Sequence, residues 1–308
     1  MQFGKTNMTA TENLEDSPTQ ARSMLVVADV DLDPRLFDHL LRQEWKVEYV
    51  LSNDEALGAA RTRPFDLILT AEGSSAKEDI RLLQQLRSVR PHTRMIILTK
   101  NSTPEDVILA LRQRAFCYFS TPYTFDSLRD VIHAAMQTPC WDDGIEVVSA
   151  TPVWIRLLVR CDRSTADRLM QFFLEVVDLP DEEKGQVAYA FREILINAMS
   201  YGGNFDPSQY VEISYFRARH AIACRVKDPG EGFSLSELYH AAVTNPPDDP
   251  FRHIPVREAA GLPPGGYGIL LSLHLVDELV YNEQGNEVML VKYLHTDPAS
   301  KGQGLKSA

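Results

Sequence analysis

The stretch FREILINA at residues 191–198 decides how the second half of the chain is interpreted, because it combines helical character with two polar side chains. Glu193 and Asn197 are four residues apart, so an α-helix would place their carboxylate and carboxamide on one face. An amide oxygen can ligate Mg²⁺, and a carboxylate can accept a proton from an attacking hydroxyl. By itself such a pair more often marks a solvated helix face, so its meaning depends on other segments.

Two glycine-containing segments follow this stretch. DPGEGF at residues 228–233 comes directly after the strand-like run CRVK, and its glycines allow the backbone to approach a ligand closely. The Asp228 carboxylate is suited to accept the exocyclic amine of adenine. PPGGYG at residues 263–268 precedes a helix that starts at Ile269, where free N–H groups and the positive end of the helix dipole favour phosphate. Taken singly, each segment is also typical of an ordinary turn or helix entry.

Together and in this order, the three segments resemble the boxes of the Bergerat-fold ATPase superfamily, which includes gyrase, histidine kinases and MutL. Within it the likeness is to the anti-sigma-factor serine kinases. Their E-x-x-x-N-A box is matched at residues 193–198, and their D-x-G-x-G box at residues 228–232. Their glycine-rich third box precedes a helix that ends in a segment like Val-Asp-Glu-Leu at residues 276–279. The resemblance covers roughly residues 145–294 and implies an α+β two-layer sandwich, for which we expect a mixed sheet.

The resemblance implies ATP and Mg²⁺ as cofactors and assigns roles to individual residues. Glu193 would be the general base for a protein serine hydroxyl, Asn197 would hold Mg²⁺, and Asp228 would recognise adenine. The glycines would shape the pocket floor and contact phosphate at the end of a mobile lid over residues 234–264: Gly230, Gly232, Gly265, Gly266 and Gly268.

This sequence departs from the family at two places. Residues 264–268 lack the first glycine and the arginine of the family's G-R-G-L-G box, and Tyr201 stands where the serine kinases carry histidine. These departures affect turnover more than nucleotide binding, because phosphoryl transfer relies on positioning and charge stabilisation.

The first half of the chain alternates short apolar runs with amphipathic helical runs. The strand-like runs are MLVVA, KVEYVL, FDLILTA, RMIILT and FCYFS, and helical runs such as EDIRLLQQLRSV and FDSLRDVIHAAMQ follow them. This alternation predicts a parallel sheet with helices on both faces. Five such units in about 115 residues favour a flavodoxin-like, doubly wound α/β domain.

Residues 23–136 resemble the receiver domain of bacterial response regulators, but without its chemistry. Ala28-Asp29 stands at the family's acidic pair, Ala71 at its phosphoaccepting aspartate and Thr121-Pro122 at its lysine-proline pair. Only Asp29 and the hydroxyl residue Thr99 are retained. An alanine methyl group cannot accept a phosphoryl group, and one carboxylate is a poor cage for Mg²⁺. We therefore predict a pseudo-receiver that signals by contact or dimerises, with Glu72 as a surface carboxylate.

The domain organisation follows from these patterns. We expect a disordered lead-in over residues 1–22, a pseudo-receiver over 23–138, a linker with the first strand over 139–150, an ATPase domain over 145–296 and a flexible tail over 297–308. The net charge of −12 disfavours nucleic acid as a partner. No run is long and apolar enough to span a membrane, so cytoplasmic residence is expected. The four cysteines form no CxxC pair and are interpreted as packing residues.

Two functions remain open at this point. The first is a serine-protein kinase and anti-sigma-type switch that binds a sigma factor or an antagonist protein and phosphorylates the antagonist. The second is a partner-binding scaffold whose ATP site is regulatory, without phosphoryl transfer. A homodimer is compatible with either. A histidine kinase core is disfavoured, because no helix hairpin with a phosphoaccepting histidine precedes the ATPase domain and His133 is interpreted as a surface residue.

Overall fold

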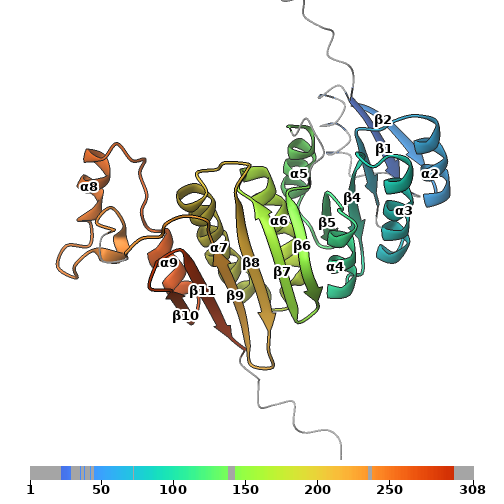
Figure 1. Cartoon of the computed structure of the whole chain (residues 1–308). Coiled ribbons are helices and arrows are strands. Elements are labelled where there is room, and N and C mark those ends of the chain that lie inside the picture. The colour runs from blue at the N-terminus through green and yellow to red at the C-terminus, as the bar shows by residue number, and fades with distance from the viewer. Residues whose placement is uncertain are drawn as a thin grey trace, which may run out of the picture.

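The structure is a computed structural model of the chain, in which two domains follow one another (Figure 1). It describes residues 22–28, 35, 38, 42, 45–71, 73–137, 143–234 and 238–294. The predicted disordered ends lie outside these residues, except for Arg22, which begins the first strand. Cys140 also lies outside them. No helix in the described ranges has the length and apolar character needed to cross a membrane.

The N-terminal domain is a parallel sheet with helices on both faces, as predicted. Its strands pair in the order β2-β1-β3-β4-β5. They are β1 (Arg22–Val27), β2 (Trp45–Val50), β3 (Leu67–Thr70), β4 (Arg94–Thr99) and β5 (Cys117–Ser120). The helices are α2 (Asn53–Thr62), α3 (Ala76–Val89), α4 (Pro104–Arg112) and α5 (Phe125–Gln137). This strand order is that of the flavodoxin-like doubly wound fold, which confirms the predicted class.

Local sequence explains these elements. Strands β3 and β4 are buried along their whole length, which requires the continuous apolar runs that the sequence supplies. Helix α3 begins with a capping box, in which the Ser75 side chain accepts from the Glu78 backbone and the Glu78 side chain accepts from the Ser75 backbone. Helix α4 begins with Thr103 as its cap and Pro104 in its first turn.

The C-terminal domain is a six-stranded sheet in the order β10-β11-β9-β8-β7-β6. Its strands are β6 (Ile145–Thr151), β7 (Trp154–Arg160), β8 (Tyr210–Arg217), β9 (Ala221–Lys227), β10 (Glu278–Tyr281) and β11 (Glu287–Tyr293). Every pairing in it is antiparallel, so the expectation of a mixed sheet was wrong. The reason is that three of the connections are hairpins, the excursion through α6 and α7 returns β8 antiparallel to β7, and β11 lies between β9 and β10 and runs opposite to both.

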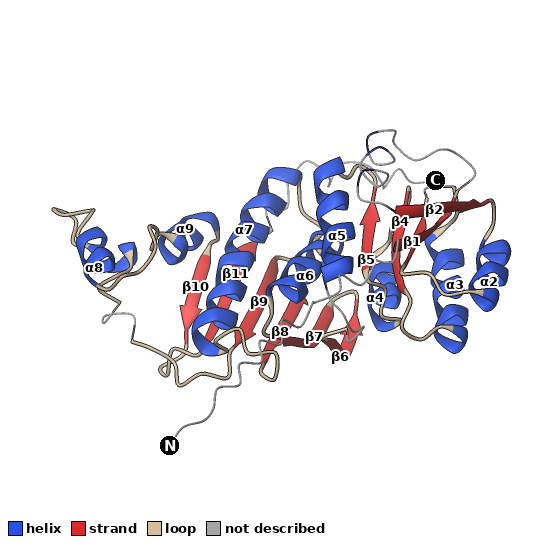
Figure 2. Cartoon of the chain, turned by 90° about the horizontal axis from the view of Figure 1, so that it is seen from above, coloured by secondary structure: helices blue, strands red, loops and turns tan. Residues whose placement is uncertain are grey.

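Helices cover one face of this sheet (Figure 2). They are α6 (Arg163–Val176), α7 (Asp181–Asn197) and α9 (Gly268–Leu275), whereas α8 (His253–Ala259) stands away from the sheet (Figure 1). The α6 and α7 helices are joined by Phe173 and Phe191, whose rings stack at 4.2 Å. Helix α9 is shorter than predicted. The Asp277 N–H donates to the Val291 carbonyl at 3.0 Å, so the chain has already joined the sheet there and Glu278 starts β10.

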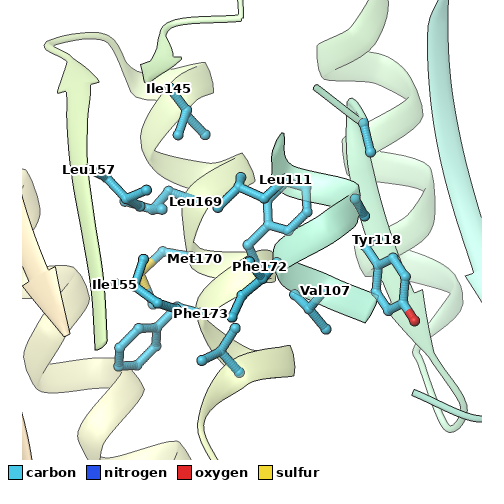
Figure 3. Packing of buried hydrophobic residues seen from close by; sticks show 14 of the residues in the cluster. Val107, Leu111, Tyr118, Ile145, Ile155, Leu157, Leu169, Met170, Phe172 and Phe173 are labelled. Atoms are coloured by element: carbon cyan, nitrogen blue, oxygen red, sulfur yellow. The ribbon is translucent and has the colours of Figure 1, made fainter. Parts of the chain in front are cut away.

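The two domains pack against each other through α6 (Figure 3). Val107 and Leu111 of α4 lie opposite Leu169 and Phe172 of α6, and all four belong to one apolar core that crosses the domain boundary. The edge strand β5 of the N-terminal sheet is covered by the same helix. Covering an edge strand with a helix prevents its free N–H and C=O groups from pairing with the strand of another chain.

One arginine of α6 ties this boundary together. Arg168 is buried and donates to the Phe116 carbonyl of the first domain at 2.8 Å, while its Nη2 lies 2.6 Å from the Asp143 carboxylate. Its guanidinium also lies over the Phe116 ring, 4.4 Å from the centroid. Nearby, the Ser120 backbone N–H donates to the Glu175 carboxylate at 2.9 Å. Polar groups are thus paired across an otherwise apolar boundary, which fixes its register.

Candidate functional site

The C-terminal end of α7 carries two of the predicted site residues. Glu193 and Asn197 lie one turn apart and both line a cavity of about 650 Å³. Three acidic residues in the first turn of α7 favour the helix by complementing its dipole. After Asn197 the backbone continues as a π-helical turn over Ala198–Gly202. Such turns often occur at functional sites, and this one brings Gly202 to the cavity wall.

Asp228 follows directly on β9 and lies on another wall of the cavity. One of its carboxylate oxygens accepts the Gly230 N–H at 2.8 Å. Partial burial raises the pKa of Asp228 above its ordinary value, and that hydrogen bond opposes the rise. The other carboxylate oxygen accepts no hydrogen bond from the described residues, and Asp228 lines a cavity large enough for a nucleotide.

The glycines of the Asp228 loop are needed because this loop interlocks with the turn between β10 and β11. Gly232 has φ +86°, and a Cβ added there would lie 2.0 Å from the Gln284 carbonyl oxygen. On the other side, Gly285 has φ +80°, and its Cβ would lie 1.9 Å from the Phe233 carbonyl oxygen. The interlock holds Gly230 and Gly232 at the cavity, as the sequence predicted.

The glycine-rich third segment meets the cavity at the start of α9. A Cβ on Gly268 would lie 2.4 Å from Oε2 of Glu193, so the first residue of α9 packs directly against that carboxylate. Gly266 has φ +92° and also lines the cavity. Gly265, with φ +141°, is the only predicted site residue that lies outside the described lining. The structure therefore brings seven of the eight predicted residues together around one cavity.

Sequence reasoning did not identify Gly202 as a site residue. A Cβ there would lie 2.2 Å from the Asp228 carboxylate, so only glycine lets the turn after α7 pass behind that side chain. The adjacent glycines Gly202 and Gly203, five residues after Asn197, were a visible signal. Arg257, on the distant helix α8, was also missed. It lines the same cavity, and nothing in the local sequence indicated this.

Aromatic side chains complete the site. Phe233 and Tyr281 meet edge to face at 5.3 Å and line the cavity near Asp228. Burial and the neighbouring Asp228 charge raise the pKa of Tyr281 to about 12, so its phenol stays neutral. Tyr201, at the position where histidine was expected, is 66% exposed at the rim. A flat apolar wall beside a carboxylate suits a heteroaromatic base that carries an amine.

The carboxyl edge of the receiver sheet carries no acidic side chain at its described signature positions. Ala28 follows β1, Ala71 follows β3 and is buried, Thr99 ends β4, and Thr121-Pro122 follows β5 with a cis peptide bond. The two predicted acidic positions beside them, Asp29 and Glu72, lie outside the described residues. Ala71 thus stands where the family's phosphoaccepting side chain would be placed.

Neither the cysteines nor clusters of potential metal ligands form a second site in the described part of the chain. Cys117, Cys161 and Cys224 are buried free thiols, which agrees with their interpretation as packing residues. Burial raises the pKa of the Cys117 thiol to about 12 and that of Cys161 to about 11. Within the described ranges, no three His, Cys, Asp or Glu side chains cluster in a way that would hold a metal ion.

Comparison with known proteins agrees with both domains. Residues 162–292 match the family model described as the histidine kinase-like ATPase domain. The transcriptional regulatory protein ZraR of Salmonella typhi is 26% identical over 129 residues, which are 41% of this chain and 29% of that protein. The transcriptional regulatory protein GlrR of Escherichia coli is 26% identical over 137 residues, which are 42% of this chain and 31% of that protein. The chain thus spans under a third of the length of these curated relatives.

Similar solved structures are receiver proteins. A CheY-like response regulator receiver domain protein from Methanospirillum hungatei JF-1 is 22% identical and covers 38% of this chain and 94% of its own, with a TM-score of 0.32. A response regulator from Thermotoga maritima is 17% identical and covers 38% of this chain and 99% of its own, with a TM-score of 0.34.

The fold and the matches together describe a receiver-like domain followed by an ATPase domain, a combination that suggests a signalling regulator. More particularly, residues 162–292 match the histidine kinase-like ATPase domain, and the N-terminal domain is a flavodoxin-like sheet that is similar to response-regulator receivers.

Proposed function

We propose that this chain is an ATP- and Mg²⁺-dependent signalling regulator whose ATPase domain acts as a serine-protein kinase of the anti-sigma type. The observation that carries the proposal is the single cavity lined by Glu193, Asn197, Asp228 and the glycine-rich segment before α9. Its volume of about 650 Å³ lies within the range of small-molecule sites.

The residues fit the two cofactors. Asp228 would accept the adenine amine, Phe233 and Tyr281 would contact the base, and the backbone at Gly266 and Gly268 would receive the phosphates, since all five line the cavity. Asn197 offers one amide oxygen, which suits Mg²⁺ because that ion keeps several waters and substrate phosphates among its ligands. When bound, the ion would neutralise phosphate charge in a cavity that holds four carboxylates.

Glu193 supports transfer over mere binding, since its carboxylate lies at the first residue of α9, beside the glycine-rich segment. In the proposed reaction the serine Oγ of a protein substrate attacks the terminal phosphorus, and its proton passes to Glu193. The bond to the bridging oxygen breaks and ADP leaves. The proposed protein partners are a sigma factor and its antagonist, with the antagonist as the phosphoacceptor.

Two substitutions test the proposal. Calorimetry with ATP and Mg²⁺ should show binding by the wild type and a loss of at least tenfold in affinity for Asp228→Asn, because the amide presents donors to the adenine amine. Glu193→Gln should bind ATP with unchanged affinity but fail to produce phosphoserine on an antagonist. Binding unaffected by Asp228→Asn would refute the assigned site.

A second function, an ATP-regulated scaffold without transfer, is favoured by one observation. Alanine occupies position 71 after β3, so the receiver-like domain lacks a phosphoacceptor at that position. The domains are linked by direct packing of α6 on the first domain and of α4 on β6. For a scaffold, ATP binding would change partner affinity, while phosphoserine would remain undetectable with every antagonist tested and Glu193→Gln would behave like the wild type.

A further inference from the structure

The cavity contains a buried cation that has no anionic partner among the described residues. Arg257, on α8, is 7% exposed and lines the cavity with Glu193, Asp228, Glu231 and Glu287. Among the described lining residues it is the only arginine or lysine. Buried charges in proteins are ordinarily paired with an opposite charge. No carboxylate lies within ion-pair distance of Arg257 in the described part of the chain.

Backbone carbonyls hold Arg257 in place instead. Its Nε and Nη2 donate to the Pro263 carbonyl at 3.0 and 2.8 Å, and its Nη1 donates to the His240 carbonyl at 3.1 Å. A guanidinium has five N–H donors, so one on each Nη atom remains after these three bonds. The fixed fork is thus left with two donors that have no partner among the described residues.

The position of this fork is set by the glycine-rich segment. A Cβ on Gly265 would lie 3.8 Å from Nη2 of Arg257, and one on Gly266 would lie 3.2 Å from its Cδ. The Gly266 carbonyl accepts the Ala242 N–H at 2.9 Å, which joins the two ends of the segment that carries α8. Arg257 therefore lies beside the loop at which the proposed phosphates would bind.

We propose that Arg257 is the charge partner of the terminal phosphate of a nucleoside triphosphate and takes the place of the arginine that the glycine-rich segment lacks. The inference rests on the proposed function and specifies how its site distinguishes ATP from ADP. Planar guanidinium groups suit this role because two parallel N–H donors match two phosphate oxygens. With four carboxylates around it, the cavity disfavours a bare triphosphate, so one fixed cation contributes to selectivity as well as affinity. Because Arg257 is on α8, loss of the terminal phosphate would be sensed directly by that segment.

Titration of the full chain with ATP, ADP and adenosine, each with Mg²⁺, tests the inference. Arg257→Gln should weaken ATP binding by about tenfold or more, change ADP binding by less than about threefold and leave adenosine binding unchanged. Adenosine affinity also reports whether the base pocket remains folded. Arg257→Lys keeps the charge without the planar fork and should recover part of the preference for ATP. Arg252→Gln is the matched control, because Arg252 lies on the same segment but is exposed and outside the lining.

The outcomes separate the two levels of the proposal. If the wild type binds none of the three ligands, the proposed function fails and the inference fails with it. If the wild type binds them but has no preference for ATP over ADP, or if Arg257→Gln weakens all three equally, the nucleotide site stands and Arg257 is only a structural clamp.

Discussion

Replacing Arg168 by methionine should destabilise the whole chain, because this side chain joins the domains inside their shared core. The side chains of Arg168 and Asp143 are 3% and 6% exposed. Removing one partner of a buried ion pair costs about 3–5 kcal/mol, since the other charge is left unpaired. This is a large part of a typical domain stability, and it corresponds to a fall in melting temperature of roughly 10 °C for a chain of this size.

The cost should also depend on pH. Burial already raises the pKa of Asp143 even with Arg168 beside it, so removing the arginine raises that pKa further. A carboxyl group whose pKa is higher in the folded than in the unfolded state is tolerated when protonated and costs stability as pH rises. The difference between Arg168→Met and wild type should therefore be smaller at pH 5 than at pH 8.

Urea unfolding of the full chain, followed by tryptophan fluorescence and by circular dichroism, measures this effect. The matched control is Arg156→Met, which removes an exposed pair with Glu212 and should cost less than about 1 kcal/mol. The double variant Arg168→Met/Asp143→Asn should recover part of the loss, because no buried charge then remains unpaired. A cost for Arg168→Met no greater than that of the control, or equal costs at both pH values, would refute the reasoning.

Two further predictions concern one residue in each domain. Gly202→Ala should weaken adenosine binding by about tenfold or more, since its Cβ would displace the Asp228 carboxylate. Gly185→Ala, at an exposed position of α7 with open space around it, should bind normally and be slightly more stable. Equal affinities of the two variants in calorimetry would contradict this. Burial raises the pKa of Asp79 to about 6. As pH rises from 4 to 6, the free energy of unfolding of the wild type should therefore fall by roughly 3 kcal/mol relative to that of Asp79→Asn. Parallel stability curves for the two proteins over that range would show that this carboxyl is not buried as described.

Local sequence determined much of this molecule. The apolar runs of the first domain specify buried strands, and their alternation with amphipathic helices specifies a parallel doubly wound sheet. The strand β4 and the helix α5 have the bounds that their residue patterns predict. In the second domain, the spacing of Glu193 and Asn197 and the glycines around Asp228 were readable in the same way, because helix periodicity and the freedom of glycine are properties of short segments.

Tertiary contacts decided the rest. The sheet of the second domain is antiparallel throughout, and β10 starts at Glu278, because strand direction and helix ends were set by partners far away in the chain. Gly202 matters only because Asp228 lies behind it, and Arg257 matters only because α8 is held against the glycine-rich segment. A local pattern states which conformation a segment prefers. It does not specify which distant residues the segment will contact. Such contacts place the guanidinium of Arg257, which has no charge partner in the described ranges, beside the proposed phosphate site.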